Sequence, residues 1–112
     1  MHEMSIADSV MSIIGEEVAK NKGKRAIRVV LVIGKLSSVV PDSLIFCIDS
    51  LKEGTVVQDA EFLIEEVQGK GYCKECDKEY HVGPHQFFCE VCQNVLEVRG
   101  GTELLIRELE IE

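Results

Sequence analysis

Residues 73–92 read CKECDKEYHVGPHQFFCEVC and contain four of the five cysteines of the chain, arranged as two CxxC pairs. Cys73 and Cys76 form the first pair, and Cys89 and Cys92 form the second. Two thiolates three positions apart on a tight turn can both face one ion, and two such turns complete a closed tetrahedral site of the structural zinc type. The spacing therefore predicts a four-cysteine zinc module.

Iron coordination and disulfides are the alternatives for these cysteines, because iron and iron–sulfur sites also use four cysteines and disulfides form in oxidising compartments. Residues 1–5 show no positive segment followed by an apolar run, and no stretch approaches the roughly 20 apolar residues of a membrane span. We therefore expect a cytoplasmic location with no membrane contact, where thiols stay reduced. Reduced thiols favour zinc.

Length and charge limit the classes of function. The chain has 112 residues, enough for one small domain with an appendage held together by a metal. Its formal net charge of −8 disfavours nucleic acid as a partner. The cysteine segment from Lys70 to Arg99 has four basic and five acidic residues, so it offers no basic surface either. The sequence contains no P-loop, nucleophile elbow or open-position metal motif, so no enzymatic activity is expected.

On the amino-terminal side of the module, apolar residues at helical spacing predict a helix over residues 6–20. A capping box from Ser5 to Asp8 is expected to open it, and Gly23 is expected to stop it. Residues 26–36 follow as a β-branched run too continuously apolar for a half-exposed strand, so they predict a central strand.

A second, shorter helix is expected from the spacing of Leu44, Ile45, Ile48 and Leu51, after the break at Pro41 to Ser43, and Gly54 is expected to end it. Cys47 lies within it among apolar neighbours and is expected to be a small buried hydrophobe without a function. Residues 61–67 and 104–111 predict two more strands, which should share one sheet.

Glycines on both sides of the module, Gly69 to Gly71 and Gly100 to Gly101, predict two hinges, the second preceded by a strand-like segment over residues 95–99. The expected fold is α+β, with a small three-stranded sheet covered by two helices and an inserted zinc-ribbon-like module. Residues 1–68 and 102–112 would form the α/β domain, and residues 69–101 the zinc module. Two narrow linkers predict few contacts between them and therefore relative motion.

His2 allows two interpretations. It is either part of a disordered terminus or a metal ligand. In the second case the α-amine of Met1, the backbone amide nitrogen of His2 and its ring nitrogen can close adjacent chelate rings, with Glu3 adding a donor through its amide or its carboxylate. Nitrogen-rich tetragonal sites of this kind suit Ni(II) or Cu(II).

The Met1-His2-Glu3 start, the amphipathic helix, the strand ending at Gly34, the two CxxC pairs and the closing strand at 105–111 together resemble the HypA/HybF family of nickel-hydrogenase maturation proteins. The resemblance spans nearly the whole chain. It implies a nickel metallochaperone whose nickel ligands include His2 and Glu3 and whose zinc ligands are the cysteines of the two pairs, Cys73, Cys76, Cys89 and Cys92.

The same resemblance implies partners: a hydrogenase-maturation GTPase, the hydrogenase large subunit and, for some members, urease accessory proteins. His81 and His85 are expected to be exposed loop residues, and Asp77 and Gln93 stand where some members carry a histidine after a CxxC pair. The alternative function is a zinc-ribbon adaptor or nucleic-acid-binding protein without a nickel role. A monomer and a homodimer are both compatible with the sequence.

Overall fold

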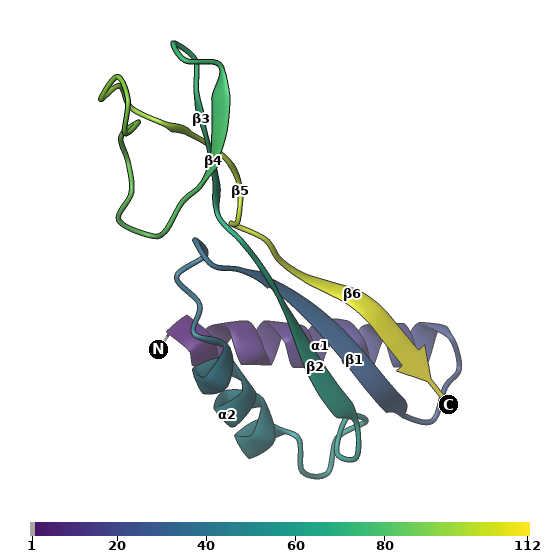
Figure 1. The fold of residues 1–112 in the computed structure, drawn as a ribbon. Helices are drawn as coiled ribbons and strands as arrows, with labels where there is room; N and C mark the ends of the chain where they lie inside the picture. The colour runs from purple at the N-terminus through teal and green to yellow at the C-terminus, as the bar shows by residue number, and fades with distance from the viewer. Residues whose placement is uncertain (1) are drawn as a thin grey trace.

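The computed structural model describes residues 2–112 and consists of two three-stranded sheets joined end to end (Figure 1), with overall extents of 55 × 26 × 17 Å. The larger part contains α1 (His2–Lys20), β1 (Ala26–Gly34), α2 (Pro41–Leu51), β2 (Glu61–Val67) and β6 (Leu104–Ile111). The smaller part contains β3 (Lys70–Cys73), β4 (Lys78–His81) and β5 (Glu97–Gly100). The predicted α+β fold class is confirmed.

Strand β1 is central, as the continuous apolar run predicts. It pairs in parallel with β2 and antiparallel with β6, which gives the order β2-β1-β6. The strands on either side of the module, β2 and β6, therefore share one sheet but are not neighbours, because β1 lies between them. β1 ends at Gly34, two residues before the predicted end.

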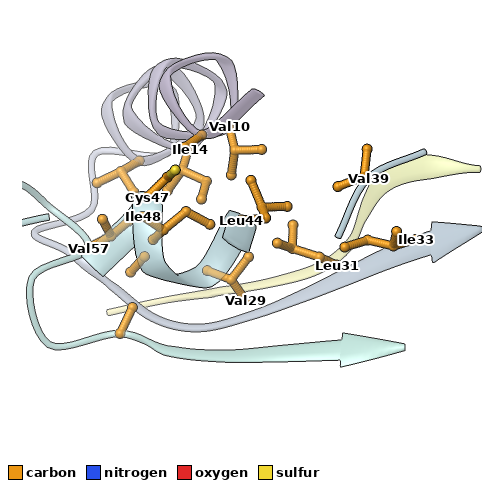
Figure 2. Packing of buried hydrophobic residues seen from close by; sticks show 14 residues of the cluster. Val10, Ile14, Val29, Leu31, Ile33, Val39, Leu44, Cys47, Ile48 and Val57 are labelled. Atoms are coloured by element: carbon orange, nitrogen blue, oxygen red, sulfur yellow. The ribbon is translucent and has the colours of Figure 1, made fainter. Parts of the chain in front are cut away.

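The core of the larger part lies between one face of this sheet and the two helices. Figure 2 shows Val29 and Leu31 of β1 facing side chains of the two helices, with Ile33 of β1 near Val39. Cys47 of α2 is 3% exposed and packs in this core, so it is the buried hydrophobe that the sequence predicts. Neither helix of the described residues is long and apolar enough to span a membrane.

The predicted start of α1 is wrong by one turn. The helix begins at His2, and Ser5, the expected cap, lies within it. Met4 and Ile6 pack against the core cluster, so tertiary packing holds the first turn in helical form and overrides the local capping signal. His2 and Glu3 consequently occupy a helix terminus instead of an extended tail.

The helix α1 ends before Gly23, as predicted, but Gly23 is not the left-handed residue at its end. The left-handed residue is Lys22, with φ 55°, and the N–H of Gly23 donates to the carbonyl of Val18 at 2.8 Å, which is a Schellman arrangement. Gly23 is required for another reason: a Cβ there would come within 2.3 Å of a methyl group of Ile111.

The two parts meet at a narrow junction of three backbone segments. A Cβ at Gly34 would lie 2.0 Å from the carbonyl oxygen of Gly101, and a Cβ at Gly101 would lie 2.4 Å from the Cα of Gly69. The N–H of Leu36 also donates to Gly101 O at 2.7 Å. The end of β1 and the residues just after it thus contact both linkers, where the sequence predicts hinges with few contacts. The first predicted hinge is also wrong in extent, since β3 already begins at Lys70.

Candidate metal sites

Two tight turns position the four cysteines. Cys73 ends β3, and the β3–β4 hairpin returns through Asp77, which has φ 50°. In the second turn the N–H of Cys89 donates to Asn94 O at 2.8 Å, and Gln93 has φ 62°. In both turns the residue after the second cysteine is therefore left-handed, which brings each pair of thiols onto the inside of its turn.

The four sulfur atoms form one cluster, in which all lie within 4.8 Å of one another. Cys73 Sγ is 3.4 Å from Cys92 Sγ, and Cys89 Sγ is 3.9 Å from Cys76 Sγ. Zinc–sulfur bonds of about 2.3 Å in a tetrahedron place the sulfurs about 3.8 Å apart, so the cluster fits a tetrahedral zinc ion. Cys73 and Cys89 are buried, which keeps solvent from half of the ligand set.

Hydrogen bonding distinguishes the thiols. Tyr80 Oη lies 3.4 Å from Cys89 Sγ, and this bond, with backbone N–H groups of Cys92 and Val91, lowers the pKa of Cys89 to about 6. The same bond raises the pKa of Tyr80 to about 12, and contact with Cys92 raises the pKa of Cys76 to about 12. The cysteines must lose their thiol protons to bind a metal ion, so binding strengthens as pH rises.

The other polar residues of the module stay outside this cluster. Tyr72 Oη donates to Asp77 at 2.6 Å, and the guanidinium of Arg99 stacks 3.9 Å from the centre of the Tyr72 ring. His81 and His85 are both exposed, as predicted, but only His85 lies in a loop, because His81 is the last residue of β4.

The amino terminus brings His2 and Glu3 together in the first turn of α1, while the α-amine of Met1 lies outside the described residues. His2 Nδ1 is 3.8 Å from Glu3 Oε2, and the imidazole is 61% exposed. Glu3 Oε2 also accepts a hydrogen bond of 3.4 Å from the N–H of Val40, directly before α2. The N–H of Glu3 itself and that of Val40 lower the pKa of the Glu3 carboxyl group.

Two contacts at these sites were not predicted from the sequence. The Tyr80 bond to Cys89 depends on the β3–β4 hairpin, and the Val40 bond to Glu3 joins residues 37 positions apart. The aromatic residue nine positions before Cys89 is the only signal in the sequence for the first contact, and the second has none.

The fold and the four-cysteine cluster define a small metal-binding protein with a cysteine module inserted into an α/β sheet. A family model described as "HypA: Hydrogenase/urease nickel incorporation, metallochaperone, hypA" matches residues 1–111. The chain therefore belongs to the HypA family of nickel-incorporation metallochaperones.

Individual relatives agree. The chain is 40% identical over 113 aligned positions to the hydrogenase maturation factor HypA of Geobacter metallireducens and 39% identical to that of Geotalea uraniireducens, with full coverage of both chains in each case. A solution structure of HypA protein superposes with a TM-score of 0.73 at 25% identity, over 100% of this chain and 97% of that one. The solution structure of the nickel metallochaperone HypA from Helicobacter pylori superposes with a TM-score of 0.69 at 24% identity. This match covers 97% of this chain and 96% of that one, and it supports the fold.

Proposed function

We propose that this chain binds Ni(II) at its amino terminus and passes the ion to a hydrogenase large subunit with the help of a partner GTPase. The observation that carries the proposal is the placement of His2 and Glu3 side by side in the first turn of α1, in a chain that belongs to a nickel-incorporation family. Nickel is the cargo in this proposal, so its site must both bind the ion and release it.

The helix start supports nitrogen donors. The first N–H groups of a helix have no partner within the helix, so the amides of His2 and Glu3 are not committed to the backbone ladder. They can join the imidazole of His2 and the α-amine of Met1 in a nitrogen-rich site of the type Ni(II) favours. The Glu3 carboxylate already accepts a hydrogen bond from the N–H of Val40. This favours the backbone amide of Glu3 as the nickel ligand, and the carboxylate then connects α1 to the start of α2.

The four cysteines, in this proposal, bind a structural Zn(II). Residues 69–101 then form a zinc module, and residues 1–68 and 102–112 form the nickel-binding domain. Four thiolates occupy every position of a tetrahedral ion, so zinc supplies no catalysis and the protein acts as a binding protein instead of an enzyme. A reducing cytoplasm, our proposed location, keeps the thiols available.

Metal analysis of protein that begins at Met1 tests the proposal. We expect one zinc per chain after purification and one further nickel per chain in a calorimetric titration, with the zinc retained. Nickel that displaces zinc, or a chain that takes up no nickel, would contradict the two-site assignment. The alternative, a zinc-ribbon adaptor without a nickel role, predicts zinc alone.

The partner GTPase gives a second prediction, because the exposed side of α1 carries acidic residues that a basic surface could recognise. Glu16 is exposed and Glu17 is half-buried, with its carboxylate 3.8 Å from Lys20. Replacing both glutamates by lysine should weaken GTPase binding about tenfold at low salt, and the difference should shrink as salt is raised. The double variant Glu79→Lys/Glu90→Lys, with the same charge change in the cysteine module, is the control. Equal binding of all three proteins at low salt would exclude this surface.

A further inference from the structure

Tyr80 of β4 contacts the metal cluster through its hydroxyl group, with Tyr80 Oη 3.4 Å from Cys89 Sγ. A hydroxyl group can donate or accept, but a thiolate bound to a metal has no proton, so in the metal-bound form only Tyr80 can donate. Among the described residues, no other side-chain hydroxyl is hydrogen-bonded to any of the four sulfurs. The contact is therefore specific to one ligand of the four.

The β3–β4 hairpin places the Tyr80 ring. Tyr80 stands directly opposite Gly71 in the antiparallel register, and Gly71 is buried. A Cβ at Gly71 would approach Val82 to 3.1 Å and Leu96 to 3.3 Å, so the absence of a side chain lets these two side chains pack closely against β3. Cys89 is only 1% exposed, so water has little access to replace the hydroxyl as a donor.

We infer that Tyr80 is a positioning residue for the four-cysteine metal centre, and that its hydroxyl, by donating to the Cys89 thiolate, controls how strongly the centre retains its metal. The inference rests on the proposed zinc assignment. Four thiolates around one divalent ion leave the centre with a net negative charge, and a hydrogen bond to one of them withdraws part of that charge from the buried sulfur. The bond stabilises the thiolate form of Cys89 that the metal requires, and without it that thiolate stays buried without its side-chain donor.

The test compares Tyr80→Phe with Tyr72→Phe. Both variants remove one phenolic hydroxyl from the same small sheet, but the Tyr72 hydroxyl donates to Asp77 and not to sulfur. Zinc affinity, measured by competition with a chelator, should fall about tenfold or more in Tyr80→Phe and stay unchanged in Tyr72→Phe. In Co(II)-loaded protein, the sulfur-to-cobalt charge-transfer band of Tyr80→Phe should move to longer wavelength, because the sulfur is richer in electrons.

Equal zinc affinity and equal cobalt spectra for the two variants would overturn the role of Tyr80. A wild-type protein that binds neither zinc nor cobalt through four thiolates would instead overturn the site assignment itself. If Tyr80→Phe fails to fold with metal bound, a chain with 3,5-difluorotyrosine at position 80 decides the matter. It keeps the ring and donates more strongly, so its cobalt band should move to shorter wavelength, and an unshifted band would refute the inference.

Discussion

A Gly-Ser extension before Met1 should weaken nickel binding about tenfold or more, a loss of about 1.4 kcal/mol or more, while zinc content and thermal stability stay the same. The extension converts the α-amine of Met1 into a peptide nitrogen and moves the free amine two residues away, so one donor and its chelate ring are lost. No side chain is altered. Calorimetric nickel titration of the extended and natural chains makes the comparison.

The control carries the same dipeptide after Glu112, at the other end of the chain, where the backbone of residue 112 is hydrogen-bonded to Arg25 and Lys24. This protein should bind nickel as the natural chain does. Binding to the natural chain should also weaken on acidification, since the amine and the imidazole must lose protons to coordinate. Equal nickel affinity of the amino-terminally extended protein would exclude Met1 as a ligand. A His2→Ala variant that bound nickel normally would exclude His2.

The parts of the fold that the sequence predicts well are those whose signal is local. The β-branched run of β1 predicts a buried central strand, because only a strand covered on both faces or in the middle of a sheet can hold so many consecutive apolar residues. The spacing within each CxxC pair is also a local signal for the thiol cluster, because two cysteines three positions apart on a tight turn can both face one ion.

The parts that were missed depend on contacts between distant residues. Strands β3 and β4 have only four residues each, so neither periodicity nor apolar content marks them. Their pairing in the second sheet, β3 with both β4 and β5, makes them strands. The capping pattern predicts too late a start for α1, because Met4 and Ile6 pack on the core and no capping rule includes that packing. Val40 and Tyr80 contact the two candidate sites for the same reason: folding, and not spacing, brings them there.

Replacing Cys89 by alanine should unfold the cysteine module and leave the larger sheet folded. Structural zinc contributes roughly 10 kcal/mol or more to small modules of this kind, and Cys89 is a buried member of the thiol cluster that we propose binds it. The main hydrophobic core, by contrast, contains no residue from 69–101.

Cys47→Ala is the matched control, because Cys47 is equally buried but packs in the main core and is not part of the thiol cluster. It should keep its zinc and lose about 1 kcal/mol of unfolding free energy, the usual order for a small core truncation.

Zinc content, together with amide NMR spectra that report each part separately, distinguishes the variants. In Cys89→Ala, signals from β3, β4 and β5 should collapse to disordered positions while those of α1, α2 and β1 persist. Because Leu36, just after β1, donates to Gly101 in the linker, some shifts near Gly34 are expected, but loss of all cooperative structure would mean that the two parts fold as one unit.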